Sequence, residues 1–86
     1  MSKEEINRKL KRILLSLIGD SIFDMETIQY VDLLDDAQMD SLMFISIVIE
    51  IEESFDIIVP DDKMVMEKFR TLSEIAQIIY DTKKLL

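Results

Sequence analysis

Hydrophobic positions near the N-terminus repeat at the spacing of one helix face. Over residues 3–18 these positions are Ile6, Leu10, Ile13, Leu14, Leu17 and Ile18. Residues three and four apart share one side of a helix, so the pattern predicts an amphipathic helix. Ser2 and Glu5 predict a capping box at its start, and Gly19 predicts a left-handed residue that ends it.

Residues 20–40 show no sustained periodicity and are rich in Asp. The pattern therefore predicts a long loop. Its hydrophobic residues are expected to anchor it to the core: Ile22, Phe23, Ile28, Tyr30, Val31, Leu33 and Leu34. Loops longer than about 12 to 15 residues are uncommon in compact domains unless they serve a function.

Residues 41–55 permit two interpretations. Four Ile residues at positions 45, 47, 49 and 51 alternate with other residues, which is typical of a strand. A helix would instead begin at Asp40 or Ser41 as the N-cap. One of its sides would then carry Leu42, Ile45, Val48, Ile49 and Glu52. We favour the helix, because a strand without a hairpin partner would leave its backbone groups unpaired.

Two further helices are expected after residue 59. Pro60 at a first helical position, followed by two Asp residues, predicts a short helix through about Glu67. Thr71 and Glu74 predict a second capping box, which opens the last helix. Its pattern consists of Leu72, Ile75, Ala76, Ile79 and Tyr80, followed by Lys83 and Lys84 in the last turn.

The composition supports an all-α fold. The chain has 86 residues with one Gly and one Pro, which leaves little material for tight hairpins. A chain of this length holds one hydrophobic core. We therefore predict a single domain over residues 1–86, a four-helix bundle with three long helices, one short helix and a long first loop.

The absence of Cys and His excludes several kinds of chemistry. It removes disulfides, thiolate and imidazole metal sites, and the usual acyl-transfer dyads, so we expect neither an enzyme nor a metal site. A hydrolase that used a Ser nucleophile would have only carboxylates as its base. The charged N-terminus and the lack of a long apolar run predict a soluble cytoplasmic protein that does not contact a membrane.

The charge distribution points to protein partners. The net charge is -8, and no Lys or Arg occurs between Arg12 and Lys63. Such a field repels nucleic acid and attracts basic protein surfaces, although it can also serve solubility alone. Calcium binding is excluded, because the stretches from Asp24 and Asp32 lack the central Gly and terminal Glu of an EF-hand loop.

One motif carries more specific information. Asp40-Ser41-Leu42 is followed by Glu52-Glu53-Ser54-Phe55-Asp56, by Val59-Pro60-Asp61, and by Thr71 and Leu72. With the predicted helices, this series resembles the acyl carrier protein family over nearly the whole chain. The triplet alone would be weak evidence, but the full series at the family's spacing is much more specific.

The resemblance implies that Ser41 accepts 4'-phosphopantetheine from coenzyme A through a separate, magnesium-dependent phosphopantetheinyl transferase. It implies that Asp40 helps the transferase to engage and that Leu42 packs near the base of the arm and contacts partners. From the residues alone, Ser41 and Asp40 could instead be helix N-caps, and Leu42 could be a core residue. Since the chain has no Cys, the thiol would have to arrive on the arm.

Two departures from the family pattern bear on the pathway. Gln38 stands where the family commonly has Gly, and Met43, Phe44 and Ser46 follow the triplet where fatty-acid carriers tend to be acidic. A partly apolar recognition face looks more like carriers of polyketide, nonribosomal peptide or D-alanine systems. We expect Met43 to be exposed, although Met more often fills a gap in a core.

The sequence thus predicts a monomeric carrier of acyl or aminoacyl groups for polyketide, nonribosomal peptide or fatty-acid type biosynthesis. Its partners would be the transferase and the loading and synthase enzymes, which would have basic or apolar docking surfaces. The residues expected to face them are Asp36, Met43, Ser46 and Glu50. The alternatives are an unmodified acidic helical interaction module and, within the family, a D-alanyl carrier.

Overall fold

The computed structural model describes residues 1–19 and 23–85, and over these ranges the chain contains helices and no strand. The elements are α1 (Lys3–Ile18), η1 (Ile28–Tyr30), α2 (Ser41–Phe55), η2 (Asp61–Lys63), η3 (Met66–Phe69) and α3 (Leu72–Lys84), where η denotes a 3-10 turn. The predicted all-α fold is confirmed. The short helix predicted after Pro60 forms as two 3-10 turns instead of one helix.

The ends of α1 follow from its capping residues. The Ser2 hydroxyl accepts the Glu5 N–H at 3.2 Å, and the Glu5 carboxylate accepts the Ser2 N–H at 3.4 Å, which confirms the capping box. Gly19 ends the helix, and its N–H donates to the Leu15 carbonyl at 2.8 Å. Its φ of 99° is positive, but its ψ of 149° is extended, so it does not adopt the left-handed helical conformation that we expected.

The segment that leads to α2 is a loop interrupted by η1. It is held by buried or half-buried side chains: Phe23, Ile28, Val31, Leu33 and Leu34. Tyr30 was expected among these anchors, but it is 81% exposed. The tight η1 turn explains this, because it points Ile28 inward and a residue two positions later away from the core. Ile22, the remaining predicted anchor, lies outside the described residues.

The core-facing side of α2 differs from the one we predicted. Its buried residues are Ile47, Val48, Ile51 and Phe55. Leu42, Ile45 and Ile49 are exposed by 77%, 53% and 48%, so among the predicted apolar positions only Val48 is buried. Residues two apart lie on nearly opposite sides of a helix, so the alternating Ile residues are divided between core and solvent.

Two extended residues in the connection between α2 and α3 explain why the predicted short helix after Pro60 does not form. Pro60 is the N-cap of η2 with an extended ψ of 145°, not its first helical residue. Val65 is also extended, with a ψ of 130°, and this interrupts the segment before η3. Within the connection, the Glu52 carboxylate accepts the Val59 N–H at 3.0 Å, which ties the segment before η2 to α2.

The last helix begins as predicted, with one difference in its cap. The Thr71 hydroxyl accepts the Glu74 N–H at 3.2 Å. The Glu74 carboxylate, however, accepts a hydrogen bond from that hydroxyl and not from the Thr71 backbone N–H. The hydrophobic face of α3 enters the core through Leu72, Ile75, Ile78 and Ile79. Lys83 and Lys84 lie in the last turn, where positive charge favours the helix dipole.

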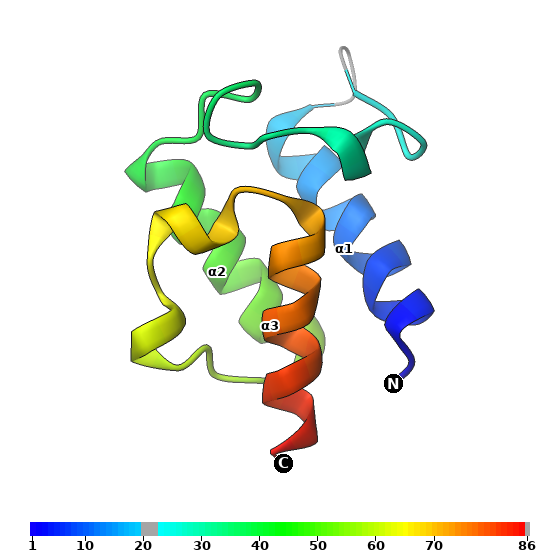
Figure 1. Cartoon of the computed structure of the whole chain (residues 1–86), viewed down its shortest axis with the longest axis vertical. Coiled ribbons are helices and arrows are strands. Elements are labelled where there is room, and N and C mark those ends of the chain that lie inside the picture. Colours follow the sequence, from blue (N-terminus) through cyan, green and yellow to red (C-terminus); the bar gives the residue numbers. More distant parts are fainter. Residues whose placement is uncertain (20–22, 86) are drawn as a thin grey trace.

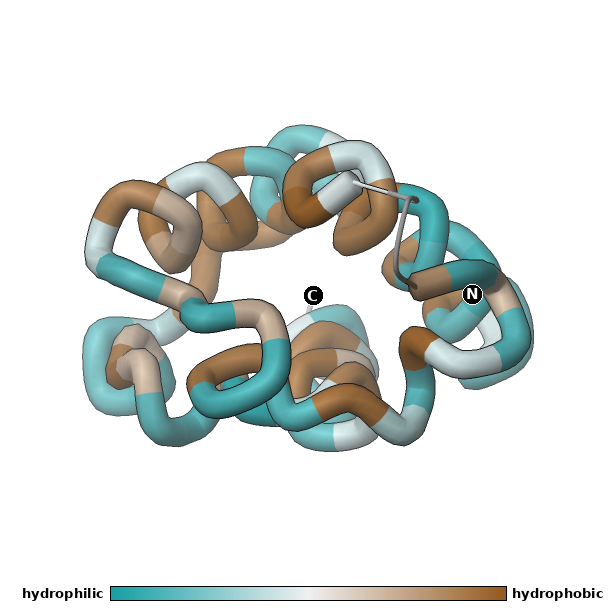
Figure 2. Tube along the Cα trace, turned by 90° about the horizontal axis from the view of Figure 1, so that it is seen from above, coloured by the Kyte–Doolittle hydropathy of each residue, from teal (hydrophilic) through white to brown (hydrophobic). Residues whose placement is uncertain are grey.

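The helices surround a shared hydrophobic interior (Figure 2). Helix α1 packs against both α2 and α3, and the ring of Phe44 meets that of Phe69 edge-on at 5.1 Å between centroids. The loop after η1 and the start of α2 lie at one end, and the start of α1 and the end of α3 lie toward the other (Figure 1). In the described ranges, no helix has the length and apolar character needed to cross a membrane.

Candidate modification site

Ser41 is the first residue of α2, and its side chain is exposed. The N-cap is Asp40, whose carboxylate Oδ1 accepts the Met43 N–H at 2.9 Å. Asp40 performs the capping, and the Ser41 hydroxyl makes no hydrogen bond to another described residue. Ser41 is therefore not a plain N-cap, and its oxygen is available for reaction at the surface.

The loop before Ser41 is held in place by backbone hydrogen bonds. The Leu33 N–H donates to the Arg70 carbonyl at 2.6 Å, and the Met39 N–H donates to the Leu33 carbonyl at 2.9 Å. Met39 is buried, whereas Asp40 beyond it is exposed. Gln38, which stands where the family commonly has Gly, has a φ of 53°. The chain thus makes a tight turn just before it enters α2.

Arg70 adds side-chain contacts to the same loop. Its Nε and Nη2 donate to Asp32 Oδ2 at 3.0 and 2.8 Å, and Nη2 also donates to Asp35 Oδ2 at 2.9 Å. The hydrogen bonds from Arg70, supported by backbone N–H donors in the turn, hold the pKa of Asp32 below its usual value. The charge of the acidic loop is thus partly neutralised by a cation 38 residues further along the chain, which the local charge pattern did not reveal.

Exposed acids occur in the loop that leads to α2 and at the N-cap of α2. Asp35, Asp36 and Asp40 are all exposed, and the Asp36 carboxylate also accepts the Asp32 N–H at 3.0 Å. Glu50 lies further along α2 and is half-buried. The carboxylates of Asp35 and Asp36 are also used to build the loop.

The outward side of α2 is apolar. We call Leu42, Ile45 and Ile49 the α2 stripe, since all three are exposed on the helix that begins at Ser41. Leu42 is therefore not a core residue. The alternation of Ile in this helix was the available signal for the stripe, because a helix cannot bury all four Ile residues on one side.

Three other predicted partner residues on α2 are half-buried. Met43 was predicted to be exposed, but it is half-buried and packs against the core. Ser46 and Glu50 are also half-buried. Met43 follows Leu42 by one position, about 100° around the helix, and this rotation carries it from the stripe toward the core.

The start of α2 has features that fit a phosphodiester at Ser41. The backbone N–H groups of Ser41 and Leu42 have no hydrogen-bond acceptor among the described residues. Free amides at a helix N-terminus, with the positive end of the helix dipole, favour a phosphate group. No group of three or more potential metal-ligating side chains occurs in the part of the chain that the structure describes.

Comparison with known families agrees with this geometry. A family model described as the phosphopantetheine attachment site matches residues 8–79, a range that includes all of α2. A search of curated proteins found no match. Domains of this family carry 4'-phosphopantetheine as a covalently attached group. Because the match spans most of the chain and the fold is the expected small helical one, the chain belongs to the phosphopantetheine-binding family of acyl carrier proteins.

Proposed function

We propose that Ser41 is the attachment residue and that the chain presents acyl or aminoacyl groups to partner enzymes. The observation that carries this proposal is the exposed hydroxyl of Ser41 at the first position of α2, which makes no hydrogen bond to another residue that the structure describes. When attached, 4'-phosphopantetheine supplies the terminal thiol that holds the cargo as a thioester. The chain itself, which has neither Cys nor His, then acts as a carrier and not as a catalyst.

The chain's own residues take little part in the attachment reaction. The Ser41 oxygen forms a bond to the phosphorus of the pantetheine phosphate, the diphosphate bond of coenzyme A breaks, and adenosine 3',5'-bisphosphate leaves. The hydroxyl proton passes to a base of the transferase. Asp40 holds the start of α2 through Oδ1, while its Oδ2 makes no hydrogen bond to the described residues. That second oxygen is available to the transferase.

The docking surface that we propose is the α2 stripe with its acidic border. An exposed apolar row can be buried against a partner, and neighbouring carboxylates can speed its approach and fix its orientation. Asp36 and Glu50 would supply this charge, with Met43 and Ser46 at the edge of the stripe. The lack of acids at Met43, Phe44 and Ser46 supports a polyketide, nonribosomal peptide or D-alanine system more than a fatty-acid system.

Incubation with a phosphopantetheinyl transferase, coenzyme A and Mg²⁺ tests the attachment. Intact mass should increase by one arm for the native chain and for Ser46→Ala, a control on the same helix. Ser41→Ala should gain none. If the native chain stays unmodified with several transferases, the alternative of an unmodified acidic interaction module is the better account.

The docking surface can be tested by association rates with the transferase at several salt concentrations. Glu50→Lys should slow association and flatten its salt dependence, because screening acts over about 8 Å at physiological ionic strength. Asp36→Lys should act in the same direction, but it also removes the bond to the Asp32 N–H, so Glu50→Lys is the cleaner variant. Unchanged rates in both would show that the acids serve solubility only.

A further inference from the structure

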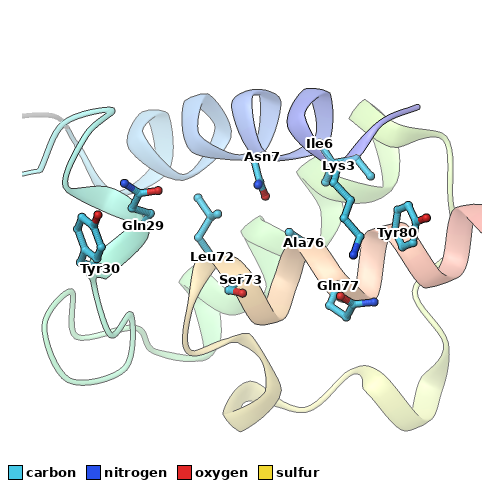
Figure 3. A pocket seen from close by; sticks show the side chains of 10 residues that line it. All are labelled: Lys3, Ile6, Asn7, Gln29, Tyr30, Leu72, Ser73, Ala76, Gln77 and Tyr80. Atoms are coloured by element: carbon cyan, nitrogen blue, oxygen red, sulfur yellow. The ribbon is translucent and has the colours of Figure 1, made fainter.

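A hollow of about 300 Å³ lies between α1, η1 and α3, and we call it the α1–α3 groove. Figure 3 shows its lining side chains, which come from these three elements and not from α2. The groove is therefore built without the helix that carries Ser41. Its volume is at the lower end of the range for ligand pockets in proteins.

The groove has an apolar floor and polar walls. Ile6 and Leu72 are buried beneath it, and the carboxamides of Asn7, Gln29 and Gln77 line it. Gln29 Nε2 donates to the Glu26 carbonyl at 3.1 Å and Gln77 Nε2 donates to Asp81 at 2.9 Å, while neither amide oxygen accepts a hydrogen bond from a described residue. The Asn7 side chain projects from α1 toward α3 (Figure 3) and makes no hydrogen bond to the described residues.

The lining residues include no carboxylate, although the chain has 18 Asp and Glu residues. Lys3 lies at one end of the groove, with its Nζ 4.7 Å from the centroid of the Tyr80 ring. The Nζ of Lys84 lies 4.9 Å from the same ring. Lys3 and Lys84 thus place two positive charges at this end of the groove, and Asp81, which accepts a hydrogen bond from Gln77, places one negative charge nearby.

The length of the groove limits what it can hold. Leu72 and Tyr80 both line it, and eight residues of helix separate them, which corresponds to about 12 Å. An extended peptide rises about 3.3 Å per residue, so about four residues would fill this length. The free amide donors and acceptors along the walls match the N–H and C=O groups of such a backbone.

We propose that the α1–α3 groove binds a short acidic segment of a partner protein in extended conformation. A carboxylate of the segment pairs with Lys3, within reach of Lys84, and its backbone bonds to Asn7, Gln29 and Gln77. Since no α2 residue lines the groove, a partner bound there leaves Ser41 and the α2 stripe accessible. A tethered carrier of this kind can visit other enzymes without leaving its first partner, which raises the effective concentration of its cargo.

The test uses the ¹⁵N-labelled, unmodified chain and the peptide acetyl-Leu-Gly-Glu-Glu-amide. Titration should shift the side-chain amide signals of Asn7, Gln29 and Gln77, and the peptide with Gln in place of both Glu residues should bind at least tenfold more weakly. Lys3→Glu and Gln77→Glu should each weaken binding of the acidic peptide at least tenfold. Both positions are exposed, and an acid at the start of α1 suits the helix dipole, so the variants should remain folded.

Two controls separate groove binding from other effects. Arg12→Glu makes the same charge change on α1 outside the groove, and it should weaken binding less than threefold. Ser41→Ala should bind as the native chain does, so the result does not depend on attachment of the arm. The proposal is overturned if the Gln peptide binds equally well, if Arg12→Glu weakens binding as much as Lys3→Glu, or if the shifts fall on α2.

Discussion

The Asp40 carboxylate accepts the Met43 N–H at 2.9 Å, and this bond sets the residue at which α2 begins. Loss of an N-cap side chain usually destabilises a protein by about 1 kcal/mol, whereas Asn caps about as well as Asp. We therefore expect Asp40→Ala to lower the free energy of unfolding by about 1 kcal/mol in urea titrations. Asp40→Asn should change it by no more than a few tenths.

The same pair of variants separates capping from recognition. If the Asp40 carboxylate contacts the transferase, Asp40→Asn should slow modification of Ser41 while its stability stays near native. A variant Asp40→Asn that is as unstable as Asp40→Ala would show that the bond to Met43 depends on charge. A modification rate equal to the native one would remove the proposed transferase contact.

Gln38 offers a stabilising substitution. Its φ of 53° is in the left-handed region, which side chains other than Gly adopt at a cost of about 1 kcal/mol or more. We expect Gln38→Gly to raise the free energy of unfolding by about 0.5 to 1 kcal/mol. Gln77→Gly, the same substitution inside α3, should lower it by about 1 kcal/mol. If Gln38→Gly destabilises the chain as much, the turn before α2 is not strained.

The Arg70 contact predicts a pH dependence of stability. Arg70 holds the pKa of Asp32 below its unfolded value, so the stabilisation is fully present above the usual Asp pKa of about 3.9. It is lost as the pH falls through the lowered folded value. Arg70→Gln should raise the pKa of Asp32 in carboxyl ¹³C titrations and move acid unfolding to higher pH.

A second carboxyl group provides the control for that titration. Hydrogen bonds from Thr27, first from its backbone N–H and then from its hydroxyl, lower the pKa of Asp24, and Arg70 contributes nothing to it. Its titration should therefore be the same in Arg70→Gln as in the native chain. A parallel rise in the pKa of both Asp24 and Asp32 would point to a general loosening of the loop. An unchanged pKa of Asp32 would contradict Arg70 as the cause of its lowered value.

Ile47 and Ile49 provide a matched pair on α2. Ile47 is fully buried, and Ile49 is 48% exposed. Ile47→Ala should destabilise the chain by about 2 to 5 kcal/mol, the range for large-to-small core substitutions, and Ile49→Ala by less than about 1 kcal/mol. Loading by a partner enzyme should weaken in Ile49→Ala despite its stability. Equal melting temperatures for the two variants would contradict the orientation of α2.

How far the fold could be predicted depended on the range of the interactions involved. The capping residues and 3.6-residue repeats of α1 and α3 are local, so both helices were predicted close to their observed bounds. For α2, exclusion of a lone strand predicted the helix, but the alternating Ile residues did not show which side is buried. The contact of Arg70 with Asp32 joins residues 38 apart, and no local pattern indicates it.

For the candidate site, too, the local features could be predicted from the sequence and the features set by packing could not. Ser41 was proposed from the motif around it, and its place as the first residue of α2 is set by the local capping by Asp40. The half-burial of Met43 depends on the rotation of α2 against the core, which only the folded structure sets. The α1–α3 groove was not predicted at all, because its lining residues come from three separate elements.

The central claim is that the arm is attached to Ser41. The most direct measurement is fragmentation mass spectrometry of peptides from the native chain after reaction with a phosphopantetheinyl transferase, coenzyme A and Mg²⁺. We predict a single arm, located on Ser41 and absent from Ser46 and Ser54, which lie half-buried further along α2. An arm located on either of those residues, or no arm on any peptide, would contradict the claim.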